Sequence, residues 1–445
     1  MKNDKEKSIT DEIVEKLCSE ENKNNEEMNE AQRALTNYLT VLFKGTKQPA
    51  VKRLFSFFNV NQKFIPLTSK SGLPMERSAI LNGFAAHYLD LDDTQANLRG
   101  HPGATIFSTL FAVTAEEDSV ESLLWAYVQG VELAGKFGKI LNPQLAWHGW
   151  HTTGLIGTIA AAAAIGVYKK FDKQQLINLL SFAATQASGL EIEAGSDGKP
   201  FNAGIAARNA ITAYLFVKSG LTANQDPFGS NRGWFEVVQG RMISAPDIVQ
   251  GWLNPAEIIE PGLWFKAHPF CSAAMSSLDA AKELYRKGVR LPDCQRIVIH
   301  FPVEGDHALR FENPQNGKEG KFSAEYIVWQ VLTFGDVKDD YFELANVPDD
   351  FNERKVLFTR KHDLLKEIEE ARPTKIDVLL KNGSSLSSEI IFPKGSPKNK
   401  VSTKELIYQL NKETGQRSEI IKNIILNPQA KAIKINLTVN RGNQL

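Results

Sequence analysis

Apolar residues follow two different patterns along this chain, and the pattern changes at Pro261. Residues 31–260 carry apolar side chains mainly at helical spacing, as in 119–141 and 203–220. Beyond Pro261 the chain contains β-rich runs such as RIVIHF at 296–301. We therefore expect a large helical part and a smaller part of mixed structure.

A β-hairpin is predicted in the second part. Residues 375–381 end at an Asn-Gly pair, 382–383, and a second β-rich run follows at 386–392. Asn-Gly tolerates the positive φ angles of a tight turn and is the strongest short-range sign of a hairpin. Gly-Ser-Pro at 395–397 ends this pattern, and helical periodicity returns over 403–425.

The sequence thus predicts a mainly α fold in two domains. We expect a helical domain formed by 1–261 and 397–445, an inserted α+β domain at 262–396, and a ligand cleft between them. The Ala-rich run 155–168 is predicted to be a buried core helix, because it is shorter than the roughly 20 residues that cross a bilayer. Residues 1–30 are polar, and part of them is expected to be disordered.

Composition argues against several classes of protein. Lys plus Arg and Asp plus Glu both total 52, and a formal net charge of zero does not suit a nucleic-acid partner. No segment resembles a signal peptide or a membrane span. The three cysteines, Cys18, Cys271 and Cys294, are too far apart for a disulfide framework or a CxxC zinc site. A cytoplasmic protein without a bound metal is the simplest expectation.

The first candidate site combines LDLDDT at 89–94 with RGHPG at 99–103. Asp90 and Thr94 share one face if this turn is helical, and His101 precedes the proline that opens the next helix. An acidic helix cap with a structural histidine is the plainer alternative. Metal binding by the aspartates is less favoured, since no glutamate or histidine follows at a typical ligand spacing.

The second candidate site is WHGWHTTG at 147–154. His151 is expected at the start of the Ala-rich helix, with Thr152 or Thr153 as its N-cap. The positive end of the helix dipole favours a neutral imidazole, which can abstract a proton. The spacing of His148 and His151 invites zinc, but the glycine between them and the lack of a third ligand argue against it. The alternative is a capped helix with surface aromatic residues.

Two lysines are candidates for binding an anion. Lys199 precedes a proline on a glycine-rich loop, GSDGKP at 195–200, and Lys266 lies among aromatic residues near the domain junction. The loop is not a P-loop, because the GxxxxGK[ST] pattern is missing. The alternatives are an ordinary loop beside a helix and a linker lysine that lies along apolar surface. Cys271 is interpreted as a packing residue, since no base accompanies it.

Together these motifs resemble those of the MmgE/PrpD family. LDLDDT, GHPGA, GWHTTG with the Ala run, GKP with AARN, and FKAHPFC occur in the order found in that family, over residues 50–400. The resemblance implies a helical domain built from both ends of the chain, an inserted α+β lid, no cofactor and a homodimer. Asn202 is a departure, because members often have histidine at that position.

The resemblance also implies a set of site residues, namely Asp90, Thr94, His101, His151, Lys199, Lys266 and Tyr326. We expect His101 and His151 to transfer protons on either side of the substrate. Asp90, supported by Thr94, would orient His101 or bind a substrate hydroxyl. Lys199 and Lys266 would bind carboxylates, and Tyr326 in FSAEYIVW would donate a proton or a hydrogen bond from the lid.

The implied activity is that of a cofactor-independent lyase acting on a small di- or tricarboxylate. Members of the family dehydrate 2-methylcitrate, decarboxylate cis-aconitate or epimerise iminodisuccinate, and each reaction develops negative charge on a carbon beside a carboxylate. The residues alone leave dehydration and decarboxylation open. An isomerase of a succinate-like amino or imino acid is the alternative, followed by a non-catalytic relative that binds a carboxylate.

Overall fold

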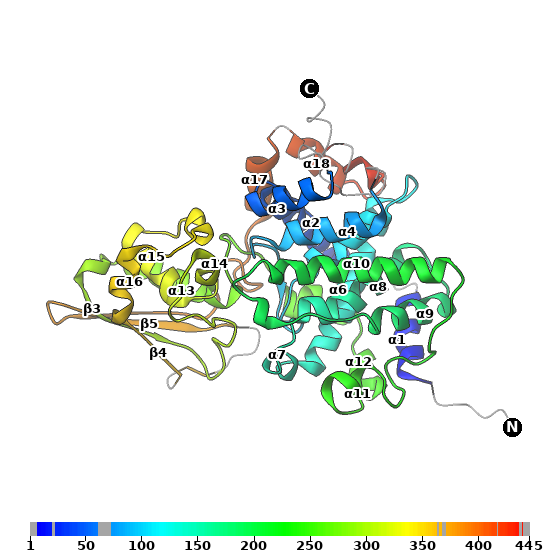
Figure 1. The fold of residues 1–445 in the computed structure, drawn as a ribbon, viewed down its shortest axis with the longest axis horizontal. Helices are drawn as coiled ribbons and strands as arrows, with labels where there is room; N and C mark the ends of the chain where they lie inside the picture. Colours follow the sequence, from blue (N-terminus) through cyan, green and yellow to red (C-terminus); the bar gives the residue numbers. More distant parts are fainter. Residues whose placement is uncertain are drawn as a thin grey trace.

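The structure is a computed structural model that describes residues 7–19, 23–60, 73–362, 365–366, 371–415, 417–435 and 438. Helices dominate it, which confirms the mainly α prediction, and Figure 1 shows a larger helical part beside a smaller part that contains a sheet. The helices of the larger part are α1 (Ile9–Cys18), α2 (Asn25–Thr46), α3 (Pro49–Phe57), α4 (Met75–His87), α5 (Pro102–Val113), α6 (Val120–Leu141), α7 (Gln144–Trp147), α8 (Thr152–Tyr168), α9 (Lys173–Ala184), α10 (Gly198–Lys218), α11 (Trp234–Gln239), α12 (Ala245–Val249), α17 (Thr403–Thr414) and α18 (Arg417–Ile425).

The smaller part combines short helices with a mixed sheet. Its elements are α13 (Met275–Arg286), α14 (Gly317–Gly320), α15 (Ala324–Phe334), α16 (Asp349–Arg354), β3 (Cys294–His300), β4 (Phe358–Lys361), β5 (Thr374–Leu380) and β6 (Ser385–Ile390). The strand order is β4-β3-β5-β6, with β3 parallel to β4 and antiparallel to β5. β5 and β6 form the predicted hairpin, and Gly383 in its turn has a φ of 86°. β4 escaped prediction because it contains a single apolar residue.

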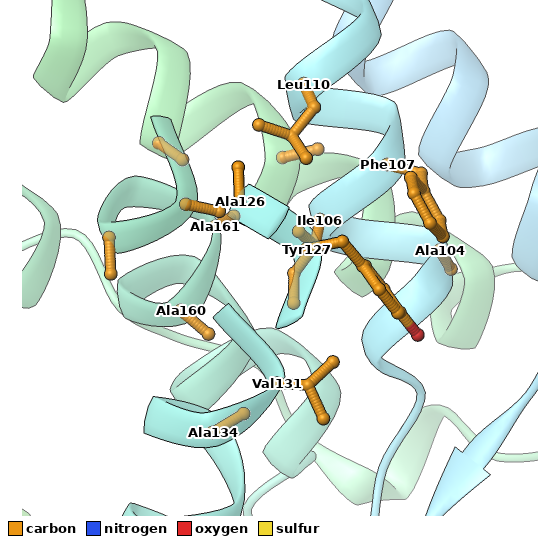
Figure 2. Close-up of a cluster of buried hydrophobic side chains, with 14 of the residues drawn as sticks. Ala104, Ile106, Phe107, Leu110, Ala126, Tyr127, Val131, Ala134, Ala160 and Ala161 are labelled. Carbon is orange, nitrogen blue, oxygen red and sulfur yellow. The ribbon is translucent and has the colours of Figure 1, made fainter. Parts of the chain in front are cut away.

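The Ala-rich helix α8 lies at the centre of the larger part. It is buried along almost its whole length, as predicted, and it packs against α5, α6, α9 and α10. Short side chains let helices approach closely, and Figure 2 shows Ala126 and Ala161 where α6 and α8 meet. A Cβ on Gly130 of α6 would lie 3.1 Å from the Ala160 carbonyl oxygen. Within the described ranges, no helix has the length and apolarity that crossing a membrane requires.

A second apolar core fills the smaller part. It buries Ile297 and Ile376 of the sheet together with Trp329 of α15. The core of the larger part takes its residues from 9–265 and 401–435, whereas the second core takes them from 264–378. The buried side chains therefore divide near the predicted junction. The domain boundaries at 261 and 397, and the action of the smaller part as a lid, stay predictions.

Both ends of the chain join the larger part. α17 and α18 pack against α2, so the predicted helical tail lies on the first part (Figure 1). α1 is capped by a capping box of Ser8 and Asp11 and buries one apolar face. Residues 9–18 of the region 1–30 therefore form an ordered helix. Residues 1–6 and 20–22 of that region lie outside the described residues.

Two connecting segments join the parts and run side by side. β1 (Thr94–Gln95) of the larger part pairs antiparallel with β2 (Leu263–Trp264), which places Thr94 opposite Trp264. One residue further on, the Phe265 N–H donates to the Gly395 carbonyl at 2.9 Å. Gly395 has a φ of 97°, and a Cβ there would collide with the Phe265 carbonyl oxygen. The segment that enters the smaller part is therefore held by the larger part and by the returning chain.

Candidate active site

A cavity of about 820 Å³ lies between the two parts, a volume typical of small-molecule sites. The larger part contributes four predicted site residues to its lining, Thr94, His101, His151 and Lys199. The smaller part contributes side chains that include Ser272 and Arg372. Asp90 and His87 line a much smaller pocket that shares Lys199 with this cavity. Most of the predicted residues thus meet at one place.

Two of the histidines occupy the N-cap positions of neighbouring helices. His101 precedes α5 and His151 precedes α8, and neither side chain makes a capping hydrogen bond. The helix starts are tied together, because the His101 N–H donates to the Thr153 hydroxyl at 3.1 Å. The prediction of Thr152 or Thr153 as the N-cap is therefore wrong. The threonine hydroxyls serve this connection, since Thr152 donates to the Arg99 carbonyl.

His151 is held as a neutral imidazole. Its Nδ1 lies 3.1 Å from the side-chain nitrogen of Asn202, which also donates to the Leu190 carbonyl. The amide therefore donates to Nδ1, and the ring proton resides on Nε2. Burial, followed by the charge of Lys199, holds the pKa of His151 well below its usual range. The neutral state expected from the helix dipole thus has burial as its main cause.

His87, which the sequence analysis did not single out, lies at the centre of the site. Its Nδ1 is 2.9 Å from Asp92 Oδ2, and its Nε2 is 3.2 Å from Lys199 Nζ. An ammonium group only donates, so the ring proton of His87 is on Nδ1 and points to Asp92. The ring centroids of His87 and His101 are 4.4 Å apart, and those of His87 and His151 are 5.7 Å apart. Three imidazoles are thus packed together inside the protein.

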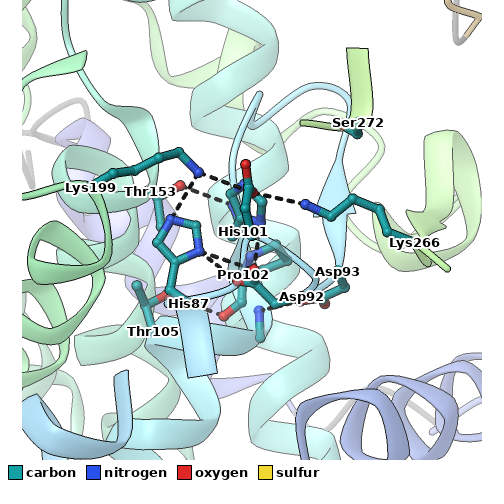
Figure 3. Close-up of polar contacts among 12 residues, drawn as sticks. His87, Asp92, Asp93, His101, Pro102, Thr105, Thr153, Lys199, Lys266 and Ser272 are labelled. Atoms are coloured by element: carbon teal, nitrogen blue, oxygen red, sulfur yellow. Dashed lines mark hydrogen bonds and ion pairs between the residues drawn. The ribbon is translucent and has the colours of Figure 1, made fainter. Parts of the chain in front are cut away.

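Asp90 joins the two lysines. Its Oδ1 lies 3.1 Å from Lys199 Nζ and 2.9 Å from Lys266 Nζ. Figure 3 shows Lys199 and Lys266 reaching in from opposite sides, with His101 between them. Burial alone would raise the pKa of Asp90, but the two ammonium groups hold it well below its usual range. Asp90 has a φ of 54°, a left-handed conformation that aspartate tolerates better than most residues.

The structure corrects the local setting predicted for three residues. Thr94 lies in β1 rather than on a helical turn with Asp90, and its buried hydroxyl has no hydrogen-bond partner among the described residues. Lys199 lies in the first turn of α10 rather than on a loop, because Pro200 suits the start of a helix. Lys266 is 2% exposed, so it is a buried ion-pair partner rather than a linker lysine.

Tyr326 is not brought to the cavity. It lies on α15 inside the second core, where it packs against Trp329 and Phe351. Its hydroxyl donates to the Tyr341 carbonyl at 3.2 Å. The role as a donor to the substrate, which the family resemblance implies, finds no support in this position, because the phenol is engaged by a backbone acceptor within the smaller part.

The adjacent residues Asp92 and Asp93 contact different groups. The Nε2 and Nδ1 atoms of His101 lie 3.3 Å from Asp90 and Asp92 respectively, and burial lowers the pKa of His101 to about 3 despite these carboxylates. Asp93 instead accepts hydrogen bonds from the Tyr127 hydroxyl at 2.7 Å and the Gly103 N–H at 3.0 Å. Burial raises the pKa of Asp93 to about 7. Asp92 therefore supports the imidazoles, and Asp93 supports the start of α5.

The site also gathers a possible metal-ligand set. One ligand atom from each of His87, Asp90, Asp92 and His101 lies within 4.8 Å of the others. Spacing along the chain gave no sign of this set, because His87 precedes the aspartates at the end of α4. Two ammonium groups already neutralise Asp90, and a divalent cation would have to face both. Chemistry without a metal therefore remains our expectation.

Imidazoles, ammonium groups and buried carboxylates beside a cavity define a site suited to acid–base chemistry on a small anion. The chain belongs to the MmgE/PrpD family. Residues 12–243 match the MmgE/PrpD N-terminal domain, and residues 268–412 match the MmgE/PrpD C-terminal domain. The family predicted from the sequence motifs is thereby confirmed.

Similar proteins include cis-aconitate decarboxylases from mammals. The human protein is 24% identical over 345 residues, in a match that covers 71% of this chain and 67% of that protein. The mouse protein is 24% identical over 349 residues, with the same coverage of the two chains. A cis-aconitate decarboxylase-like protein of Aspergillus oryzae is 27% identical over 293 residues, 60% of each chain.

Proposed function

We propose that this protein is a cofactor-independent lyase that decarboxylates a small tricarboxylate of the cis-aconitate kind. The proposal rests on one observation above all, the meeting of His101, His151 and two lysines around the buried Asp90 beside a cavity. The names of the similar proteins favour decarboxylation over dehydration. Both reactions belong to the lyases expected from the sequence.

The lysines are the proposed carboxylate binders. Lys199 and Lys266 both contact Oδ1 of Asp90 and retain donors for a second acceptor. A substrate carboxylate that enters beside them meets two positive charges for one negative charge. The same charges stabilise the electron-rich intermediate that forms when CO2 leaves.

The histidines are the proposed proton-transfer pair. Loss of CO2 breaks a carbon–carbon bond, and its electron pair moves into the adjoining alkene and carboxylate. A proton must then be delivered to carbon. Bound carboxylates add negative charge beside His101 and His151, which raises the pKa of each imidazole and favours the protonated form that can donate. His87 and Asp92 hold these rings and Lys199 in place.

The reaction can be tested by NMR in D2O. The purified protein is incubated separately with cis-aconitate, 2-methylcitrate and iminodisuccinate. We expect cis-aconitate to lose one carboxylate and the product to carry one deuterium at the protonated carbon. Loss of water from 2-methylcitrate would indicate a dehydratase, and deuterium exchange without net product would indicate an isomerase. Binding of the acids without any reaction would indicate a non-catalytic relative.

We also propose a cytoplasmic homodimer, as the family resemblance implies. Size-exclusion chromatography with light scattering should give twice the mass of the chain across a range of concentrations. A mass equal to one chain at every concentration would contradict the dimer.

A further inference from the structure

Arg372 differs from the other site cations in its partners. Lys199 and Lys266 both form ion pairs with Asp90. Arg372 also lines the cavity, from the smaller part, but it has no carboxylate partner among the described residues. Arg372 is half-buried, and a partly desolvated cation that has no carboxylate among its described neighbours is stabilised when a ligand supplies the anion. Its setting therefore indicates an anionic ligand.

The guanidinium is held in place by groups other than acids. Its Nη1 donates to the Ser272 hydroxyl, and its central carbon lies 5.3 Å from the centroid of the Trp264 ring. Ser272 and Trp264 also line the cavity. Burial lowers the pKa of Arg372, but arginine stays protonated in proteins at neutral pH. The charge is thus fixed in position before a ligand binds.

Two donors on residues that line the same cavity are buried without partners. The Thr94 hydroxyl and the Trp264 indole N–H have no hydrogen-bond partner among the residues that the structure describes. These residues face each other across the β1–β2 pair, and both line the cavity. Buried donors without acceptors are costly. A ligand with acceptor oxygens at this end of the cavity would relieve that cost.

We propose that Arg372 receives a third carboxylate of the substrate and so selects tricarboxylates over dicarboxylates. This inference rests on the proposed function, in which Lys199 and Lys266 bind the other carboxylates. A guanidinium binds a carboxylate through two parallel hydrogen bonds, and the Arg372 guanidinium lies over the Trp264 ring. Thr94 and Trp264 offer further donors to the same group.

The test removes the charge from the protein and, separately, from the ligand. Binding of propane-1,2,3-tricarboxylate and of methylsuccinate, which lacks one of its carboxylates, is measured by calorimetry for the parent and for Arg372→Met. We expect the substitution to weaken tricarboxylate binding about 10- to 100-fold and to change methylsuccinate binding less than about twofold. Arg372→Lys should give an intermediate loss, because lysine keeps the charge without the planar fork.

A matched control is Arg290→Met. Arg290 lies in the smaller part, packs on Tyr285 at 3.5 Å and donates to backbone carbonyls, but it does not line the cavity. Arg290→Met should bind each ligand with the affinity of the parent.

If Arg372→Met loses the same affinity for both ligands, Arg372 is a structural residue. If it loses no affinity for either ligand, Arg372 does not contact the bound acid. If the parent bound both acids equally well, the proposed site for a third carboxylate would be wrong, but the proposed function would stand. If it bound neither, the proposed function itself would fail.

Discussion

His151 is the side chain whose protonation state is defined most closely by its contacts. Because Asn202 and burial keep it neutral and in one tautomer, its replacement removes a proton carrier without removing a charge in the free protein. We expect His151→Gln to lower kcat about 10²- to 10⁴-fold while changing KM much less. Steady-state kinetics with the substrate found by NMR give both constants.

His148→Gln is the matched control for this prediction. His148 is exposed, lies three residues earlier and does not line the cavity. Its kcat should equal that of the parent. Should His151→Gln turn over substrate at the parent rate, proton transfer would have to be assigned to His101 or to the neighbouring His87.

Lys266→Met should weaken both substrate binding and folding. Lys266 is buried and lies 2.9 Å from Asp90, so the substitution leaves a buried carboxylate with Lys199 as its remaining ammonium partner. We expect a loss of about 1–3 kcal/mol in the free energy of unfolding and an increase in KM. Urea titrations and kinetics measure the two effects.

The double variant Asp90→Asn with Lys266→Met tests the cause of that loss. Removing both groups should cost less than the sum of the two single substitutions, because each single substitution already loses the Asp90–Lys266 contact and the sum counts that loss twice. Strict additivity would mean that the ion pair contributes nothing to stability.

Activity should survive exhaustive chelation. A metal at the His87, Asp90, Asp92 and His101 set would face two ammonium groups that already contact Asp90. Protein dialysed against EDTA, with its metal content measured, should keep the parent kcat. If kcat fell on chelation and one particular divalent ion restored it, the set would bind a catalytic metal.

Sequence reasoning located most of these residues because the motifs are local. His101 next to a proline and His151 before an Ala-rich helix both mark helix starts. His87 was not predicted, because its role depends on contacts with Lys199 and His101, which belong to other sequence motifs. Its one local sign was its place shortly before Asp90. Tyr326 illustrates the opposite failure, since a motif residue points into the core.

The start of α5 should make stability depend on pH. Asp93 accepts the Gly103 N–H there, and burial raises its pKa from 3.8 to about 7. The folded state therefore holds this proton more tightly than the unfolded state does, and the associated stability, complete below pH 3.8, is lost as the pH rises to about 7. Asp93→Asn cannot ionise, so its stability relative to the parent should improve over this pH interval, by up to ~1.4 kcal/mol per pH unit.

Urea midpoints of parent and variant at several pH values between 5 and 8 provide the measurement. Asp340→Asn is the control for loss of an exposed carboxylate. A constant difference between Asp93→Asn and the parent would mean that Asp93 does not titrate in this range.

Elements with a clear repeat were predictable, and elements without one were not. Helix α6 follows from apolar periodicity, α8 from its continuous Ala-rich run, and the β5–β6 hairpin from an Asn-Gly turn. β1 and β2 have two residues each, which is too short for any periodicity to show. Their pairing is decided by contacts between distant parts of the chain, yet it positions Thr94 and the segment leading to Lys266.

The smaller part should close over a bound ligand. Its side chains already reach the larger part, as in the Lys318–Asp197 ion pair and the Lys44–Asp339 ion pair at 2.7 Å. A polycarboxylate between the parts adds contacts to both, and closure excludes water from the site. We expect hydrogen exchange within 262–396 to slow when propane-1,2,3-tricarboxylate binds.

Peptides from α18, which packs against α2 and α17 in the larger part, serve as the internal control and should exchange unchanged. Unchanged exchange throughout 262–396 with saturating ligand would contradict closure. The overall division into a helical part and a mixed part was readable from the sequence, but the extent of any movement depends on contacts that no pattern encodes.

The paired connecting segments bear on how a protein of this family can diversify. Because β2 pairs with β1 and Phe265 bonds to Gly395, Lys266 is anchored with the larger part, whereas Arg372 belongs to the smaller part. Under the proposed function, mutations that accumulate in the smaller part would change which acids bind without altering His101 and His151. Recombination between relatives at the two connectors would exchange substrate preference as one inherited unit while the reaction chemistry is retained.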